Sequence, residues 1–269
     1  MSDRPRLPLR PLGRTGLAVT PIGFGAFKIG RNEGAKYPDR YDLPSDLESA
    51  AVLHGVLDLG IRLIDTAPAY GLSEARIGAA LKARRDAFVL STKVGERFED
   101  GRSHFDFSED GARRSIDRSI GLLGGPPDML LVHSDGRDVE ILREGGAVRA
   151  VLAARDEGLV RAVGFSGKTP EGARVAMEWA DVLMVAFSAR DRSHETVIEE
   201  ARARGVGILV KKGLDSGHLP ADEAIRFCLG NASVDALVIG GLSLAHLAAN
   251  VDAALEVRPP QGASAARGR

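Results

Sequence analysis

Cysteine is nearly absent from the chain: Cys228 is the only one among 269 residues. A single thiol can form neither an internal disulfide nor a cysteine-rich metal site, so we expect no bound metal. The near absence fits a reducing compartment, and we predict a cytoplasmic protein. No run of about 18 apolar residues occurs, which argues against a membrane-spanning helix. Residues 1–10 also lack the apolar segment of a signal peptide.

Net charge and aromatic side chains are also scarce. The formal charge is only -1, so nothing global favours nucleic acid or an anionic membrane as a partner. Aromatic residues make up 5% of the chain, too few to line a large, steroid-like pocket. Apolar residues make up 44%, enough for a full core. We therefore expect a globular protein, a monomer or small homo-oligomer, that acts on a small molecule.

Eight short apolar runs alternate with longer amphipathic stretches. Each run is rich in Val, Ile, Leu or Phe and is largely free of charge. Strands of a parallel sheet have this composition because both of their faces are buried. The runs are residues 22–27, 61–66, 88–93, 129–133, 160–165, 182–187, 206–210 and 237–239.

Helix start signals lie between these runs. Ser45 begins a capping box, Ser108 and Ser243 precede apolar residues at helical spacing, and Thr169 is followed by proline. Eight strand–helix units predict a single (β/α)8 TIM barrel over residues 1–257, with an open doubly wound sheet as the competing fold.

The two ends of the chain differ from this pattern. Residues 7–12 and 17–19 flank a glycine-bounded turn, and we expect a β-hairpin that caps the bottom of the barrel. Residues 30–44 are polar and predict a loop above the first strand. Residues 258–269 lack any periodicity and predict a disordered tail.

Ionisable residues stand at the ends of three successive predicted strands: Asp65, Lys93 and His133. Tyr70 follows shortly after the first of them. Adjacent strands lie about 4.8 Å apart, so these groups can converge at one end of a barrel, where such enzymes react. Charges at the ends of buried strands are costly unless they are paired or functional.

These four residue types suit the reduction of a carbonyl. A phenol, with an ordinary pKa of about 10, is a poor acid at neutral pH, and a neighbouring ammonium favours its phenolate. Asp65 can hold Lys93 charged, and His133 can orient the substrate oxygen. Taken singly, each residue has a structural explanation, as a cap, a loop aromatic or a strand end, but their common register favours a catalytic one.

The sequence resembles the aldo-keto reductase family from about residue 7 to residue 257. Residues 62–71 read Arg-Leu-Ile-Asp-Thr-Ala-Pro-Ala-Tyr-Gly and resemble the family's first signature. Residues 91–93 and 128–133 resemble the second and third signatures. The resemblance implies Tyr70 as the proton donor, supported by Asp65, Lys93 and His133.

The resemblance also implies a nicotinamide cofactor, NADP or NAD, bound without a glycine-rich fingerprint. Its phosphates would meet helix N-termini after strands seven and eight. The implied cofactor-binding residues are Ser166, Gly167, Met184, Lys211, Lys212, Gly240, Gly241, Leu242, Ser243, His246 and Asn250.

Several of these positions depart from the family. Gly167 stands where asparagine is usual, Met184 where glutamine is usual, and Lys212 in the place of an aromatic. Leu242 and His246 align with basic residues that often grip a 2′-phosphate, and a leucine supplies no such contact. NADPH is the family habit, but these residues lean towards NADH, and the choice stays open.

The short segment between His133 and the next helix, together with charged residues around the expected mouth, favours a small polar substrate. Lys28, Arg97, Lys168 and Arg190 are those charged residues. We predict an oxidoreductase for a sugar-like or short carbonyl. Two alternatives stay open: a cofactor-binding sensor with little turnover, and a lyase that forms a Schiff base with Lys93.

Overall fold

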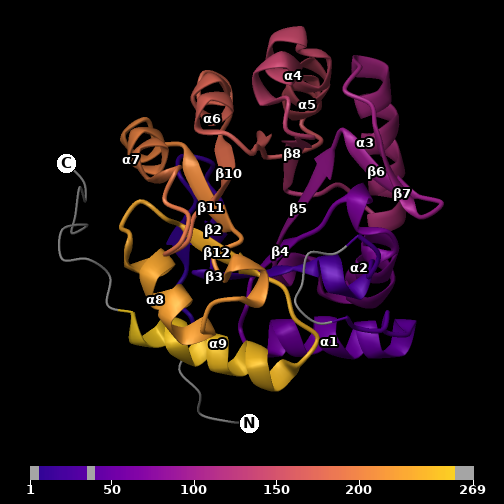
Figure 1. Cartoon of the computed structure of the whole chain (residues 1–269). Coiled ribbons are helices and arrows are strands. Elements are labelled where there is room, and N and C mark those ends of the chain that lie inside the picture. Colours follow the sequence, from indigo (N-terminus) through magenta and orange to yellow (C-terminus); the bar gives the residue numbers. More distant parts are fainter. Residues whose placement is uncertain (1–5, 35–39, 258–269) are drawn as a thin grey trace, which may run out of the picture.

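The computed structural model describes residues 6–34 and 40–257 of the chain. Each of the eight apolar runs overlaps one strand of a closed barrel, to within one or two residues at the strand ends, and Figure 1 shows this barrel with its surrounding helices. The barrel strands are β3 (Ile22–Gly25), β4 (Leu63–Asp65), β5 (Val89–Val94), β8 (Met129–His133), β9 (Ala162–Ser166), β10 (Val182–Ala186), β11 (Gly207–Lys211) and β12 (Ala236–Ile239).

All eight barrel strands pair in parallel and in chain order, and β12 closes the ring by pairing with β3. The register aligns His133 with Ser166 and Ala186 with Lys211. This arrangement is the predicted (β/α)8 barrel, and closure excludes the open sheet. Because parallel strands end at the same rim, the residues after each strand meet at the carboxyl-terminal mouth.

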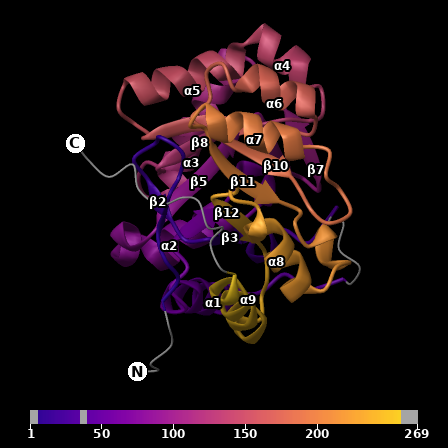
Figure 2. The same ribbon diagram turned by 90° about the vertical axis from the view of Figure 1, so that its left-hand side faces the viewer.

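Helices connect the strands and surround the barrel (Figures 1 and 2). Ser45 completes the predicted capping box, and Ser108, Thr169 and Ser243 each cap a helix by accepting a hydrogen bond from a backbone amide. The helices are α1 (Asp46–Asp58), α2 (Ser73–Leu81), α3 (Glu109–Leu123), α4 (Asp138–Glu144), α5 (Gly146–Asp156), α6 (Pro170–Ala176), α7 (Glu195–Ala203), α8 (Ala221–Gly230) and α9 (Leu244–Glu256). In the described ranges, no helix is both apolar enough and long enough to cross a bilayer.

The predicted hairpin at the start of the chain closes the other end of the barrel. Strands β1 (Arg10–Pro11) and β2 (Ala18–Val19) pair around the turn. Leu12, Leu17 and Val19 are buried and pack with the inward-facing residues of the barrel. The hairpin is therefore a plug that fills the amino-terminal end.

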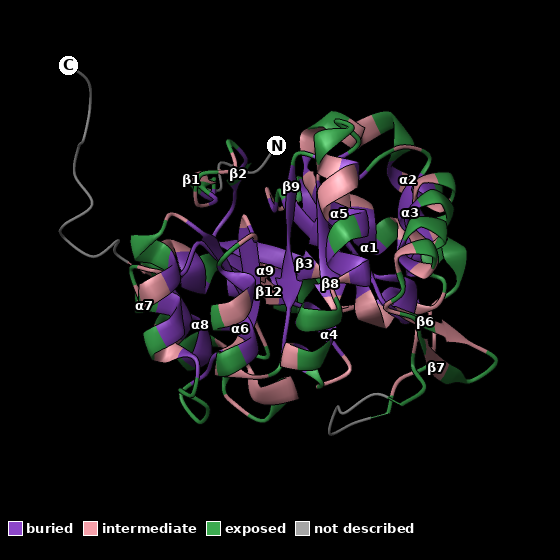
Figure 3. Cartoon of the chain, turned by 90° about the horizontal axis from the view of Figure 1, so that it is seen from above, coloured by how far each residue is buried: buried purple, intermediate pink, exposed green. Residues whose placement is uncertain are grey.

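Alternate residues of each strand face opposite sides of the barrel wall. Leu63, Leu131 and Leu209 belong to the interior cluster, while their neighbours pack against the helices. The central strands are buried and the outer faces of the helices are exposed (Figure 3). The same alternation turns the last inward residue of each strand towards the mouth.

A second hairpin was not predicted. Strands β6 (Glu96–Glu99) and β7 (Arg102–Phe105) pair as an antiparallel ribbon between β5 and α3. Asp100 and Gly101 both have positive φ at its turn. The Asp-Gly dipeptide is a strong hairpin signal in sequences and identifies this element in retrospect. The predicted tail, residues 258–269, lies outside the described residues, as does part of the loop predicted over 30–44.

Candidate active site

Asp65, Lys93 and Tyr70 form a connected group at the mouth of the barrel. The Nζ atom of Lys93 lies 2.7 and 2.8 Å from the two carboxylate oxygens of Asp65 and 3.2 Å from the hydroxyl of Tyr70. It also donates to the carbonyl of Thr66, at 2.9 Å. Tyr70 ends the short 3-10 helix η2 (Pro68–Tyr70) directly after β4, and the ring of Phe27 packs edge-on against it.

The pair formed by Lys93 and Asp65 is almost completely buried, with side-chain exposures of 1% and 3%. Burial disfavours the charged form of Lys93, but the charges and hydrogen bonds of Asp65 and Tyr70 together outweigh this penalty and raise the pKa of Lys93 above its ordinary value. Lys93 is therefore an ammonium throughout the neutral range, and it lies within hydrogen-bonding distance of the phenol.

His133 ends β8 and faces the tyrosine. The two rings are perpendicular, with centroids 6.4 Å apart. Burial, followed by the positive charges of Lys93, Lys211, Lys168 and Arg31, holds the pKa of His133 well below its ordinary value. The imidazole is thus neutral at neutral pH, so one of its two ring nitrogens donates a hydrogen bond and the other accepts one.

A second lysine projects into the mouth from the end of β11. Lys211 donates a hydrogen bond of 2.8 Å to the hydroxyl of Ser166 at the end of β9, two strands away. Burial and the neighbouring charges of Lys93 and Lys212 lower the pKa of Lys211 to about 7. Both the charged and the neutral amine are therefore present near neutral pH. Lys211, rather than Lys212, lies across the mouth, and Lys212 is exposed.

Two of the predicted cofactor residues have surroundings that explain their identity. A Cβ atom on Gly167 would lie 2.5 Å from the ring of Phe165 and 2.9 Å from the carboxylate of Asp138. No asparagine fits there without a shift of its neighbours. Met184 packs with Leu209 in the barrel interior, one layer below the mouth.

The loop after β11 carries unusual backbone geometry. Lys212, Asp215 and Ser216 have φ angles of 58°, 48° and 58°. Such angles cost non-glycine residues of order 1–3 kcal/mol each and cluster at functional sites. Arg190, from the loop after β10, donates to the carboxylate of Asp215 at 3.1 Å. Both loops rise at the mouth.

The segment after β12 leads into a helix N-terminus at the same mouth. Gly240 is exposed, and Ser243 accepts a 3.3 Å hydrogen bond from the amide of His246. Leu242 is half-buried, and Asn250 is buried further along α9. Gly241 adds a second residue without a side chain, so a ligand can approach this backbone closely.

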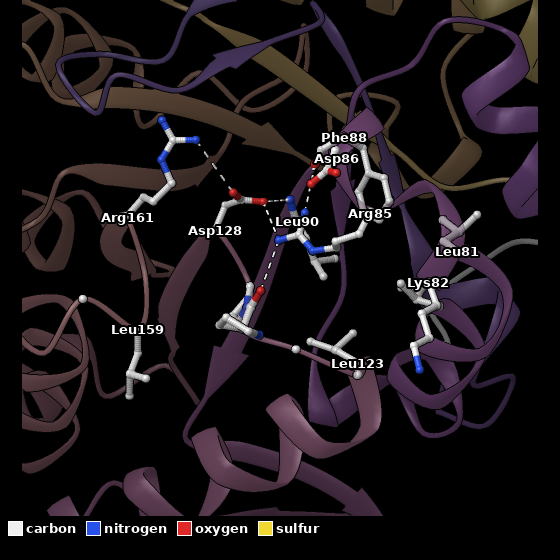
Figure 4. Close-up of a pocket in the computed structure, with 16 residues that line it drawn as sticks. Leu81, Lys82, Arg85, Asp86, Phe88, Leu90, Leu123, Asp128, Leu159 and Arg161 are labelled. Carbon is white, nitrogen blue, oxygen red and sulfur yellow. Dashed lines mark hydrogen bonds and ion pairs between the residues drawn. The ribbon is translucent and has the colours of Figure 1, made fainter.

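A pocket of about 380 Å³ at the opposite end of the barrel has a structural explanation (Figure 4). The Asp128 carboxylate there accepts from the amide of Leu90 at the start of β5 and from Arg85, which also donates to the carbonyl of Pro126. These contacts fasten the starts of β5 and β8. In the described ranges, no cluster of three or more His, Cys, Asp or Glu side chains could hold a metal ion.

Comparison with known proteins identifies the family of the chain. The model of the Aldo/keto reductase family matches residues 21–223. The chain belongs to the aldo-keto reductase family. This reductase is therefore an NAD(P)-dependent oxidoreductase. The matched range contains Asp65, Tyr70, Lys93 and His133 and ends before β12 and α9.

Named relatives and solved structures cover nearly the whole reductase. It is 30% identical to D-threo-aldose 1-dehydrogenase of a Pseudomonas species, over 90% of this chain and 92% of that protein. It is 27% identical to L-galactose dehydrogenase of Arabidopsis thaliana, over 94% and 89%. A crystal structure from Pseudomonas aeruginosa, assigned to the aldo-keto reductases, is 42% identical with a TM-score of 0.85, over 93% and 94%.

One residue of the reductase site was missed from the sequence. Glu96, at the start of β6, approaches His133 from the side of the mouth, with an Oε2–Nδ1 distance of 3.1 Å. Its neighbours along the chain carry no signature of a site, and the contact exists only because the β6–β7 hairpin folds back over η2. The Asp-Gly turn could have predicted the hairpin but not the contact.

Proposed function

We propose that this reductase interconverts a small polar aldehyde or ketone with its alcohol, using Tyr70 as the proton donor. The observation that carries the proposal is the distance of 3.2 Å between the hydroxyl of Tyr70 and an ammonium that Asp65 holds buried and charged. A general acid must lie within hydrogen-bonding distance of the groups that assist it. The hydroxyl of Tyr70 and the ammonium of Lys93 meet this condition before any ligand is bound.

The chain's own residues each have a role in this reaction. As the carbonyl carbon is reduced, Tyr70 donates its hydroxyl proton to the carbonyl oxygen. Lys93 stabilises the phenolate that remains, and Asp65 keeps Lys93 charged. In alcohol oxidation, the phenolate takes the proton back. A bound nicotinamide cofactor would supply the hydride for reduction and accept it during alcohol oxidation.

The cofactor fits the other side of the mouth. Ser166 and Lys211 would hold the nicotinamide end, because their hydroxyl and amine lie together at the ends of β9 and β11. Gly240, Gly241 and the N-terminus of α9 would hold the phosphates, since the positive end of a helix and the absence of two side chains suit an anion there. The neutral Leu242 favours NADH over NADPH.

The relatives support a polar substrate. The two named above are an aldose dehydrogenase and a galactose dehydrogenase, and a third, 29% identical over 88% of this chain, is pyridoxal 4-dehydrogenase of Microbacterium luteolum. Only residues 134–137 separate β8 from α4, which leaves little chain to form a large apolar wall. We therefore assign sugar-like or short aldehydes as the substrate class.

The alternative of a Schiff-base lyase using Lys93 has less support. A Schiff base requires a neutral amine, whereas Asp65 raises the pKa of Lys93 and two further groups accept hydrogen bonds from its ammonium. The alternative of a sensor with little turnover predicts cofactor binding without catalysis, and the experiment below separates it from an enzyme.

The test is the substitution Tyr70→Phe in the full chain, assayed with a panel of sugars, short aldehydes and bulky ketones. We expect the rate of the chemical step to fall at least about 10²-fold, the usual contribution of a general acid. Fluorescence titration with NADH and NADPH should give similar affinities for the variant and the wild type. Turnover by Tyr70→Phe close to the wild-type rate would remove Tyr70 from this role. A wild-type protein that binds NADH or NADPH but turns over no member of the panel would support the sensor.

A further inference from the structure

Lys211, at the end of β11, is a lysine of the mouth without a counter-charge. Its amine donates to the hydroxyl of Ser166, a neutral group, at 2.8 Å. The register of the barrel places it beside Ala186, the last residue of β10, which has no polar side chain. It makes no ion pair with any residue that the structure describes. An ammonium in such surroundings acts strongly on the charge of any ligand beside it.

Two carboxylates attract the amine of Lys211, and both are engaged elsewhere. Asp65 of β4 is paired with Lys93 at 2.7 Å. Asp138 of α4 accepts from two backbone amides of the loop after β9, both at 2.7 Å. Burial, followed by the positive charges of Lys93 and Lys212, outweighs this attraction and lowers the pKa of Lys211 to about 7.

The histidines around Lys211 supply no compensating charge. Burial and the surrounding cations, Lys211 among them, hold the pKa of His133 well below its ordinary value. His194, the residue before α7, is buried, and burial lowers its pKa as well. Lys211 therefore changes its charge around pH 7, where both imidazoles are already neutral.

The nicotinamide ring differs by one unit of charge between the two forms of the cofactor. It is neutral in the reduced form and positive in the oxidised form. The carboxamide and the phosphates are the same in both, so residues that bind only these parts cannot distinguish the two forms. An ammonium beside the ring can, because it repels a positive ring and not a neutral one.

We propose that Lys211 distinguishes the two oxidation states of the cofactor, because its uncompensated ammonium disfavours the positively charged ring of the oxidised form. This inference rests on the proposed function, which assigns the nicotinamide end to Ser166 and Lys211. A site that binds the reduced form more tightly makes the bound oxidised form a stronger hydride acceptor than it is in solution.

The charge of Lys211 therefore favours oxidation of the alcohol within the complex. Transfer of hydride from the alcohol carbon to the ring removes the positive charge of the ring and the repulsion with it. The phenolate of Tyr70 takes the hydroxyl proton, and the substrate becomes the carbonyl. The same repulsion opposes the reverse transfer.

Calorimetric titration of the full chain with NADH and NAD+ at pH 6 and pH 8.5 tests the proposal, with NADPH and NADP+ as a second pair. The measured quantity is the Kd of the oxidised form divided by that of the reduced form. We expect this ratio to be about tenfold larger at pH 6, where Lys211 is charged, than at pH 8.5, where it is neutral. Groups that contact only the phosphates act alike on both forms and cancel in the ratio.

Three variants separate the charge of Lys211 from other effects. In Lys211→Met the ratio should not depend on pH, and in Lys211→Arg it should stay at pH 8.5 near its value at pH 6, because an arginine keeps its charge. Lys82→Met is the matched control. Lys82 is an exposed lysine of η3 (Lys82–Ala87) at the opposite end of the barrel, and its loss should leave the ratio as in the wild type at both pH values.

Proton release supplies a second measurement, made at pH 7 in two buffers of different ionisation heat. Lys211 is about half charged there in the free protein. Binding of the oxidised form should therefore release about half a proton more than binding of the reduced form. In Lys211→Met this difference should disappear.

A ratio that is the same at both pH values in the wild type would overturn the assignment, as would a pH dependence that survives in Lys211→Met. If none of the four nucleotides bound, the proposed function and this inference would fall together. The titrations do not depend on turnover. The expected ratios in a protein that converts no carbonyl would thus count against the role of Tyr70 and not against that of Lys211.

Discussion

Two lysines at the mouth, Lys93 and Lys211, lie in opposite electrostatic surroundings. Lys93 is paired with a carboxylate, while Lys211 contacts the neutral hydroxyl of Ser166 and makes no ion pair in the ranges that the structure describes. Burial raises the energy of an ammonium that has no counter-charge. The first lysine keeps its proton, and the second, with a pKa of about 7, gives it up readily. The burial of Lys211 without an ion pair lowers the free energy of unfolding. Such a cost is expected where a group is kept for binding.

We expect Lys211→Met to be more stable than the wild type at neutral pH. As pH falls from about 10.5 to 7, the unfolded chain binds a proton at Lys211 that the folded chain does not, so the wild type loses stability over this window. The free energy of unfolding should therefore rise in the variant by on the order of 2 kcal/mol at pH 7, and by less at pH 9.5.

Urea unfolding at the two pH values measures this difference. Lys212→Met is the control, because Lys212 is exposed and its substitution should change stability little at either pH. An equal gain at both pH values, or a loss at pH 7, would contradict the assigned surroundings of Lys211.

At the scale of elements, Asp138 at the start of α4 joins the loops that follow β8 and β9. Its carboxylate accepts from the hydroxyl of Ser134 in one loop and from the amides of Lys168 and Thr169 in the other, both at 2.7 Å. It also accepts from the hydroxyl of Thr169, the cap of α6, at 2.9 Å. One buried side chain thus fixes the rim between His133 and Gly167.

Asp138→Ala should lower the free energy of unfolding by about 3 kcal/mol, because several donors lose a charged acceptor in a buried setting. Chemical denaturation measures the loss. Asp135→Ala, in the same loop, removes a carboxylate that pairs with the exposed guanidinium of Arg137 and should cost less than about 1 kcal/mol. Similar losses in the two variants would mean that Asp138 does not hold the rim.

The barrel strands and helix starts could be predicted because their signals are local. Apolar runs and the caps Ser45, Ser108 and Thr169 depend on neighbours a few residues away. The β6–β7 hairpin was missed because its strands are charged and only half-buried, so they lack the apolar pattern of the barrel strands. Its Asp-Gly turn was the one local signal.

Within the site, Asp65, Lys93 and His133 could be predicted because each ends a strand, and strand ends meet in a barrel. Glu96 could not, since its contact with His133 depends on how a hairpin folds back. The alternation of side chains along β11 distinguishes Lys211 from Lys212, but only once the end of the strand is known to one residue.

At the scale of the whole molecule, titration of His133 lowers the free energy of unfolding at acid pH, and titration of Lys93 lowers it at alkaline pH. The pKa of His133 lies well below its ordinary value, so the unfolded chain binds a proton first as pH falls below about 6.5, and stability falls. The pKa of Lys93 lies above its ordinary value, so its contribution is complete below about 10.5 and is lost as pH rises beyond that.

The acid side can be measured as the change in unfolding free energy between pH 7.5 and 5.5. We expect His133→Gln to reduce this change by about 1 kcal/mol relative to the wild type. His246→Gln, at an exposed position on α9, should leave it unaltered. An identical acid response in His133→Gln and the wild type would show that His133 is not held neutral in the folded protein.

The plug formed by β1 and β2 has a consequence for the integrity of the barrel. Leu12, Leu17 and Val19 are buried against the inward-facing residues at the amino-terminal end, where those apolar side chains would otherwise meet water. Removal of the hairpin would expose this layer without altering any residue of the mouth. A short segment far from any reacting atom thus seals the base on which the mouth is built.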